Sequence, residues 1–341
     1  MKYLLIAIAL LLILPLQARQ RDPNRNRSES VTWTDPTKAA KENRDFLIQG
    51  EYYKEGADYG VQVVALGDGN FEAYVLKGGL PGAGWERGDP REQLKGGKAK
   101  GGYYLSSTKS KAMIWIREVS PKVSKNGFAL TLQLAGETEI TLPRIERKSP
   151  TLGANPPEGA VVLFDGNSAE AWKNGEMEDG LLKAGTFSKE KFKSYTAHIE
   201  FRTPFKPEAR GQGRGNSGVY HHGRWETQIL DSFGLSGKDN QCGGIYSITE
   251  PRLNMCLPPL SWQTYDVDFT AAKFDENGKR TAWPRITVKL NGVIIHDDVE
   301  LKKDKTAASP MKGPIANEPG PIFLQDHKNP VYFRNIWVVP K

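Results

Sequence analysis

Cysteine is scarce in this sequence, which has only Cys242 and Cys256 among 341 residues. Two thiols without clustered histidines give no zinc-binding spacing, so a structural zinc module is excluded. A disulfide between them would persist in an oxidising compartment. Sequence does not show whether their Cα atoms come within about 7 Å, so the bridge is left open.

Long apolar runs are missing everywhere except at the start of the chain. Lys2 is followed by an apolar run over residues 3–16, and Leu16-Gln17-Ala18 offers a signal-peptidase site. The run is shorter than the roughly 20 residues that a spanning helix needs. We therefore expect residues 1–18 to be a removed secretory signal, which predicts a periplasmic or secreted protein with no stable membrane anchor after cleavage.

Helical periodicity is also nearly absent. The 35 glycines and 22 prolines, set among many short apolar runs, favour an all-β chain. One helix is expected, from the Asp35-Pro36 start signal to about Gln49. The formal charge of +7 admits nucleic-acid binding, but the positive charge is spread through loops. For an exported chain we therefore expect no nucleic-acid partner.

The chain divides into five predicted segments. After the signal, residues 19–34 are polar and read as a disordered tail. Residues 35–145 form a smaller, mainly β domain with the one helix, and its glycine-rich stretch 78–102 is predicted to be a surface loop around Trp85. Residues 146–158 are a proline-containing linker. Short strands separated by turn signals then fill residues 159–341, a spacing typical of a two-sheet sandwich or jelly roll.

The stretch from Arg214 to Asp231 is the richest in groups that can do chemistry. Strands at 217–221 and 225–230 joined at Gly223 would place Glu226 and Gln228 on one face, because side chains alternate along a strand. We expect that face to be wet and to carry the function. The same alternation puts Trp225, Thr227 and Ile229 on the opposite, core face.

Several motifs in order carry a family resemblance over residues 159–341. They are LFDGNSAEAW, YTAHIEFR, GNSGVY, WETQILD, VKLNG and GPIFLQDHKNPVYFRNIWV. Together they resemble the DUF1080 family, also described as the 3-keto-disaccharide hydrolase domain. The resemblance implies a concanavalin-like jelly roll, in agreement with the strand pattern. It also implies cleavage of 3-keto-glycosides by elimination across C1 and C2, followed by hydration.

That chemistry needs a base near C2, a stabiliser of the enolate oxygen and an acid for the leaving group. Glu226 is the candidate base, and Asp231 or His327 the candidate proton donor. We expect the substrate to be bound by Asn216, His221, Gln228, Gln325 and Arg334. If so, Glu226, Gln228 and the block 325–334 should share one cleft.

Some of these residues have structural interpretations that the sequence leaves open. Asp231 also suits a turn cap, and Arg334 a salt bridge with Asp326 or Glu226. His221 and His222 point to opposite faces, so they do not chelate one metal together. No cofactor is predicted, although a divalent ion near Asp231 is left open.

The sequence is also compatible with two other functions. The spacing of Glu226, Gln228 and Asp231 is similar to the paired-carboxylate strand of laminarinase-like retaining glycosidases, except that an amide stands at 228. A non-catalytic carbohydrate-binding module is the third reading, because fold does not fix function. All three take an oligosaccharide or glycoside as partner.

Overall fold

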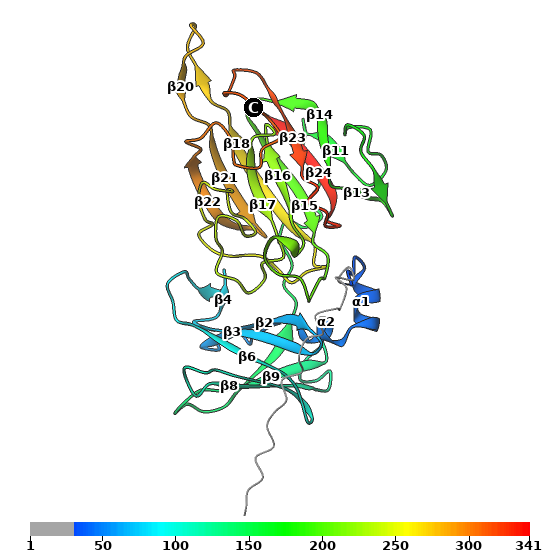
Figure 1. Cartoon of the computed structure of the whole chain (residues 1–341), viewed down its shortest axis with the longest axis vertical. Coiled ribbons are helices and arrows are strands. Elements are labelled where there is room, and N and C mark those ends of the chain that lie inside the picture. The colour runs from blue at the N-terminus through cyan, green and yellow to red at the C-terminus, as the bar shows by residue number, and fades with distance from the viewer. Residues whose placement is uncertain (1–30) are drawn as a thin grey trace, which may run out of the picture. The chain divides into compact units, whose positions relative to one another are not determined.

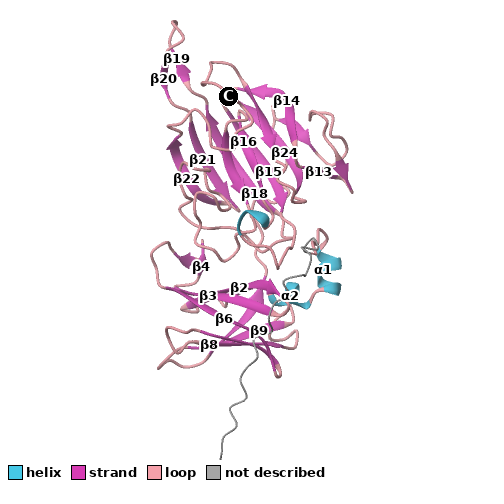
Figure 2. Ribbon diagram, in the orientation of Figure 1, coloured by secondary structure: helices cyan, strands magenta, loops and turns pink. Residues whose placement is uncertain are grey.

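The computed structural model describes residues 31–341, which form a β-barrel and a β-sandwich with little helix (Figures 1 and 2). The predicted signal at 1–18 and most of the predicted tail lie outside the described residues. Within the last tail residues, Trp33 is buried, pairs with Phe205 and donates its indole N–H to Glu42. The tail predicted to reach residue 34 is therefore ordered at its end.

The first domain is a closed eight-stranded barrel in the order β1-β10-β9-β8-β7-β6-β3-β2. Its strands are β1 (Gly50–Tyr52), β2 (Tyr59–Gly67), β3 (Asn70–Lys77), β6 (Arg91–Ala99), β7 (Gly102–Ser106), β8 (Met113–Glu118), β9 (Phe128–Gln133) and β10 (Ile140–Ile145). Closure leaves no unpaired strand edge. Apolar side chains such as Leu94, Leu105 and Ile114 fill the interior.

Two predictions for this domain are wrong. The single helix is divided into α1 (Pro36–Glu42) and α2 (Arg44–Ile48), because Asn43 is extended and caps α2 by accepting the Asp45 N–H. The predicted loop at 78–102 contains β4 (Leu80–Pro81), β5 (Gly84–Trp85) and all of β6, and Trp85 is buried. In β6 only Leu94 is fully buried, so the strand lacks an apolar pattern that sequence reading could detect.

The second domain is a sandwich of two sheets. The larger has the order β12-β13-β24-β15-β18-β21-β22, with β11 also paired to β24. Its strands are β11 (Val161–Phe164), β12 (Met177–Glu178), β13 (Leu181–Lys183), β15 (Tyr195–Arg202), β18 (Gln263–Thr270), β21 (Arg285–Leu290), β22 (Val293–Glu300) and β24 (Tyr332–Pro340). A short hairpin, β19 (Lys273–Phe274) and β20 (Arg280–Ala282), stands apart.

The smaller sheet has the order β14-β23-β16-β17. Its strands are β14 (Thr186–Phe192), β23 (Gly320–Leu324), β16 (Ser217–His221) and β17 (Trp225–Ile229). Val219 and Trp225 of this sheet pack into one core with Ile199 and Val267 of the larger sheet. The predicted all-β fold with a C-terminal sandwich is confirmed.

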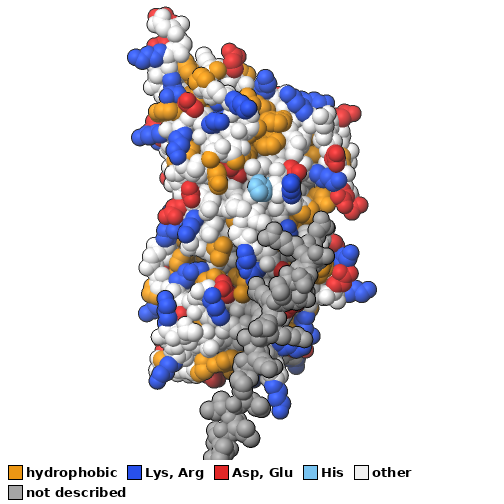
Figure 3. All heavy atoms as spheres, in the orientation of Figure 1, with side chains coloured by type: hydrophobic (Ala, Val, Ile, Leu, Met, Phe, Trp, Pro, Cys, Tyr) orange, Lys and Arg blue, Asp and Glu red, His pale blue; other side chains and the backbone are white. Residues whose placement is uncertain are grey.

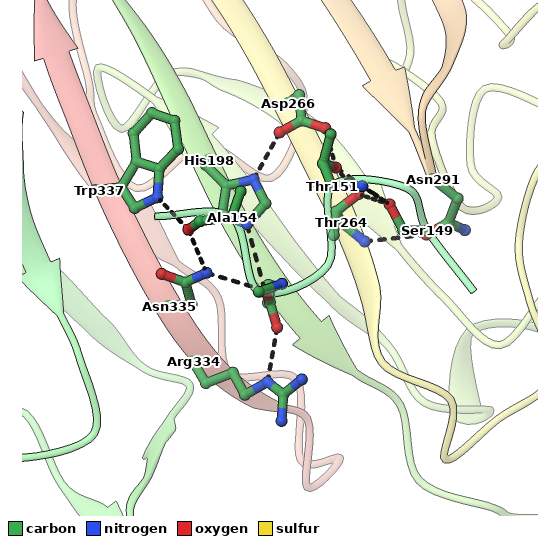
Figure 4. Close-up of polar contacts among 12 residues, drawn as sticks. Ser149, Thr151, Ala154, His198, Thr264, Asp266, Asn291, Arg334, Asn335 and Trp337 are labelled. Atoms are coloured by element: carbon green, nitrogen blue, oxygen red, sulfur yellow. Dashed lines mark hydrogen bonds and ion pairs between the residues drawn. The ribbon is translucent and has the colours of Figure 1, made fainter. Parts of the chain in front are cut away.

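The predicted linker is held against the outer face of the larger sheet by a polar network (Figure 4). The Thr151 hydroxyl donates to Asp266 at 2.7 Å, and Asp266 also lies 2.6 Å from Nδ1 of His198. Nearby, the buried carboxylate of Glu200 accepts from Nε of Arg334 at 2.7 Å. The linker is thus an ordered, hydrogen-bonded part of the sandwich surface.

The pKa of Glu200 makes this network sensitive to acid. Burial alone would raise it, but hydrogen bonds from His198, Asn335, the Gly153 N–H and Arg334 together lower the pKa to about 2. A carboxyl whose pKa falls on folding stabilises the fold fully above its unfolded value near 4.5. That contribution, about 3 kcal/mol from the size of the shift, is lost as the pH drops from 4.5 toward 2.

We therefore expect Glu200→Gln to destabilise the protein at pH 6 and progressively less as the pH falls from 5 to 3. Urea denaturation of both proteins across this range measures the difference in unfolding free energy. In the wild type, burial lowers the pKa of His198 but its contacts with Asp266 and Glu200 raise it overall, so His198 is protonated throughout this window. A difference that is independent of pH would contradict the assignment.

Cys242 and Cys256 are both buried and unbridged, so the disulfide left open by the sequence is not formed here.

Within residues 31–341, no helix is long and apolar enough to cross a membrane. On the face in Figure 3, Lys and Arg side chains are interspersed with Asp and Glu, and no single-sign stripe crosses that face.

Candidate active site

One face of the smaller sheet gathers the polar side chains of the Arg214 to Asp231 stretch. Cross-strand register places Tyr220 opposite Glu226, and Phe323 opposite Tyr220. Phe187 follows opposite Phe323, and the two rings stack with centroids 4.3 Å apart. Residues directly opposite in antiparallel strands share a face. A row of three aromatic rings therefore leads across the sheet to the carboxylate of Glu226.

Glu226 is the buried carboxylate of this face, only 1% exposed. Its Oε2 accepts a 2.6 Å hydrogen bond from the Tyr220 hydroxyl, and its Oε1 has no partner within residues 31–341. Burial raises the pKa of Glu226 to about 7, although the bond from Tyr220 acts in the opposite direction. A carboxyl with this pKa can take or release a proton near neutral pH, as a general base must.

Gln325, just after β23, completes a hydrogen-bond chain to Glu226. Its Nε2 donates to the Tyr220 hydroxyl at 3.0 Å, while its own Oε1 has no partner in the described chain. Buried acceptors without donors are rare and costly in folded proteins. The two unpaired acceptors, Oε1 of Glu226 and Oε1 of Gln325, lie at the two ends of this hydrogen-bond chain. They suit a ligand whose hydroxyl groups can donate to them.

Gly218 makes room for the carboxylate. A Cβ at this position would lie 2.4 Å from Oε1 of Glu226, so the glutamate side chain crosses β16 directly above the glycine. Any larger residue at 218 would push the carboxylate out of position. Substitution of Gly218 is therefore a sensitive way to displace Glu226 without removing it.

An amide cluster lies beside the carboxylate on the same face. Gln228 donates to Asn216 at 3.1 Å, and both side chains donate to Oε1 of Gln212, at 3.1 and 2.9 Å. Gln212 belongs to the single 3₁₀ turn, Gly211–Gly213, and is half-buried. Asn216 and Gln228 are almost fully buried, so the expectation of a wet face is wrong.

The structure brings together some of the predicted site residues. Asn216, Gln228, Gln325 and Glu226 share the face, as strand alternation predicted for Glu226 and Gln228; of the block 325–334 in the shared-cleft hypothesis, Gln325 joins them and Arg334 does not. Their catalytic and binding roles stay predictions. Neither of two large cavities in the described chain, of about 570 and 550 Å³, includes Glu226.

Two predicted substrate-binding residues lie elsewhere. His221 points into the core, where Nδ1 meets the Tyr195 hydroxyl at 2.8 Å and Nε2 meets Thr227 at 3.0 Å, because its strand parity is opposite to that of Tyr220. Burial lowers its pKa to about 3. Arg334 lies in the other sheet, bonded to Glu200, so the prediction that it shares the cleft with Glu226 is wrong.

The two predicted proton donors are not beside Glu226 either. Asp231 forms a buried ion pair with Arg214, whose Nε lies 2.6 Å from Oδ2. His327 is exposed in the loop after β23 and has no recorded bond to Glu226. Residues 31–341 contain no group of three or more His, Cys, Asp and Glu suited to a metal, so the ion left open near Asp231 gains no ligand set.

Tyr220 is the functional candidate that sequence reading missed. The signal was present: a three-residue connection, His222-Gly223-Arg224, whose first two residues have positive φ, joins the strands, and the register that pairs His221 with Trp225 sets Tyr220 opposite Glu226. Gln212 and the stacked Phe187 and Phe323 had no such signal. Phe187 lies in β14, whose sequence TFSKEKF shows no clear alternation.

Tyr220→Phe removes the donor to Glu226 and leaves the ring in place. Because that bond favours the charged carboxylate, we expect the pKa of Glu226 to rise above about 7. The acidic limb of the pH–rate profile should move to higher pH, with the maximal rate reduced by about tenfold or less. An unmoved limb would mean that Glu226 does not control it.

Comparison with known proteins gives a family match over the sandwich. The sequence profile of the 3-keto-alpha-glucoside-1,2-lyase-like domain matches residues 159–339, more than half of the chain. No curated protein matches the sequence.

Three solved structures of candidate glycosyl hydrolases from Parabacteroides distasonis ATCC 8503 are similar to part of the chain. One is 32% identical with a TM-score of 0.49, covering 54% of this chain and 85% of its own. The second is 20% identical with a TM-score of 0.39 and coverage of 54% and 94%. The third is 21% identical with a TM-score of 0.37 and coverage of 53% and 99%.

Proposed function

Because the chain belongs to the 3-keto-alpha-glucoside-1,2-lyase-like domain family through residues 159–339, we propose that this carbohydrate-active enzyme cleaves glycosides whose sugar carries a ketone at C3. The observation that carries the proposal is the buried Glu226, with a pKa near 7 and one oxygen unused. We further propose that the protein works after export, with residues 1–18 as its signal.

In the first half-reaction, Glu226 removes the proton at C2, which the neighbouring ketone acidifies. The C2–H electron pair forms the C1=C2 bond as the C1–O bond breaks, and the departing alkoxide takes up the proton that Glu226 has removed, which returns Glu226 to its charged form. In the second half-reaction, water adds across the enone, with its hydroxyl at C1 and a proton at C2. The products are a 3-keto-sugar and an alcohol, so the net change is hydrolysis.

The neighbouring side chains suit this course. The Tyr220 hydroxyl holds Glu226 in place and favours its charged, proton-accepting form. Gln212 Oε1 occupies the amides of Asn216 and Gln228 much as a sugar hydroxyl oxygen would. We propose that substrate hydroxyls replace Gln212 there, that a hydroxyl proton satisfies the free oxygen of Gln325, and that the free oxygen of Glu226 faces the C2 proton.

The geometry gives less support to a retaining glycosidase. That mechanism needs a second carboxyl group about 5–5.5 Å from the first. Here the next residue of β17 on the Glu226 face is an amide, Gln228. The nearest carboxylate in sequence, Asp231, is held in an ion pair with Arg214. A binding module remains an outcome of the test below.

The test uses both anomers of a methyl 3-keto-glucoside and their unoxidised parents. We expect the protein to release methanol from a 3-keto substrate and from neither parent. Equal activity on oxidised and parent sugars, or none on any, would reject the proposal, and binding without turnover would favour the carbohydrate-binding module.

Running the reaction in D₂O separates elimination from direct hydrolysis. Elimination and hydration place one solvent deuterium at C2 of the product, whereas direct hydrolysis leaves the original hydrogen there. The product incubated alone in D₂O corrects for slow exchange beside the ketone. Product formed without deuterium above that background would exclude elimination.

A further inference from the structure

A cavity of about 570 Å³ lies away from Glu226, and we call it the Trp262 pocket. Residues 31–341 form one compact unit, and the pocket wall comes from the α1–α2 segment, the linker and the loop before β18. Its volume is within the range of small-molecule sites. Among its lining residues are Gln49, Arg144, Arg147, Lys148, Trp262 and Arg334.

Two guanidinium groups lie against the indole ring of Trp262: that of Arg334, which lines the pocket, and that of Arg202, which contacts the ring without lining the pocket. The Cζ atoms of Arg334 and Arg202 lie 4.1 and 4.8 Å from the ring centroid of Trp262. Burial lowers the pKa of Arg202, and the neighbouring charge of Arg334 adds to that effect while Asp35 opposes it. The two positive charges repel each other, and an anion beside the ring would offset that repulsion.

Two buried hydrogen-bond donors on residues that line or adjoin the pocket are unused. Nε of Arg202 is buried without a partner in the described chain, and so is Nε2 of Gln49, a side chain only 1% exposed. Arg334 uses Nε on Glu200, and no bond is recorded for its terminal nitrogens. Buried donors left unpaired point to a missing acceptor.

The charges around the pocket leave a positive excess. Arg144 pairs with Glu146, Arg147 with Glu51, and Arg334 with Glu200. Neither Arg202 nor Lys148 forms a salt bridge within residues 31–341. An acidic ligand would supply the charge that balances them.

We propose that the Trp262 pocket is a second ligand site, which binds the carboxylate of an acidic sugar through Arg202 and Arg334. Arginine forks match a carboxylate geometrically, and the ring face of a sugar suits the apolar wall made by Pro258, Pro259 and Leu260. The site does not depend on Glu226, so it stands or falls separately from the proposed function.

Isothermal titration calorimetry of the full chain with D-glucuronate tests the proposal, with methyl glucoside, citrate and inorganic sulfate as comparison ligands. We expect glucuronate to bind and the neutral methyl glucoside not to bind. Citrate or sulfate binding at least as tightly as glucuronate would overturn the acidic-sugar assignment and show a general oxyanion site.

Arg202→Gln should weaken glucuronate binding by about tenfold or more, because a charge-assisted bond is lost. Arg117→Gln is the matched control, since Arg117 also lies over a tryptophan, Trp115, at 5.4 Å but on the barrel. Equal affinity in wild type and Arg202→Gln would refute the site.

Two further variants test whether glucuronate binds beside Trp262 and not beside Glu226. Trp262→Phe should abolish any change in tryptophan fluorescence on glucuronate binding while leaving the melting temperature near that of wild type. Glu226→Gln should bind glucuronate as wild type does. A loss of glucuronate binding in Glu226→Gln would place the ligand at the Glu226 face and overturn the second site.

Discussion

Glu226→Gln is expected to lower kcat/KM on a 3-keto-glucoside by about two to four orders of magnitude, the usual contribution of a positioned base. The amide keeps the shape of the side chain but cannot take the C2 proton. In the wild type, activity should rise with pH through about 7, as Glu226 loses its proton. Steady-state kinetics from pH 5 to 9 measure both effects.

Glu226→Gln also has a stability signature that a merely damaged protein would not show. A carboxyl whose pKa is raised by burial destabilises the fold as the pH rises from its unfolded value near 4.5 toward 7. The amide carries no such penalty, so the variant should melt at a higher temperature than wild type at pH 8, with little difference at pH 4.5. Near wild-type turnover with this stability gain would remove Glu226 from the role of base.

Asp231→Ala is expected to destabilise the protein by about 3–5 kcal/mol, because it leaves the buried guanidinium of Arg214 without its counter-ion. Arg214 also donates to the carbonyls of Ala65 and Pro207, so its charge is held in place. Urea denaturation measures the loss. The role that the sequence suggested, proton donation, predicts instead a stable variant with a large loss of kcat.

Two comparison variants separate these outcomes. Asp297→Ala removes an exposed aspartate for which no partner is recorded, and it should change stability by less than about 0.5 kcal/mol. The double variant Asp231→Leu with Arg214→Met removes both buried charges and should recover much of the loss. If the single Asp231→Ala variant is as stable as wild type, the ion pair is not structural.

The fold was readable from sequence because its hairpins carry strong local signals. The strands predicted to join at Gly223 do so, with His222 and Gly223 at positive φ, and alternation placed Trp225 inside and Glu226 on the other face. Strands without an alternating apolar pattern could not be predicted from the sequence. β6 and β14 form because neighbouring strands offer unpaired backbone groups, a tertiary effect that their own residues do not encode.

The candidate site was readable only in part, for a geometric reason. Glu226, Gln228 and Asn216 lie in one hairpin, so periodicity alone groups them. Gln325 joins them because β23 pairs with β16, but Arg334, nine residues further on, belongs to the opposite sheet. Sequence proximity cannot show that the chain changes sheets between β23 and β24.

The position of β24 has a consequence for how the protein is made. β24 lies between β13 and β15 in the larger sheet, yet β15 is synthesised more than a hundred residues earlier. A chain that crosses a membrane from its N-terminus, as the proposed export requires, delivers β15 with one open flank until β24 follows, whereas the barrel strands are all complete by Ile145. We expect the barrel to fold first and the sandwich to wait for its last strand, exposing an aggregation-prone edge that chaperones would have to shield.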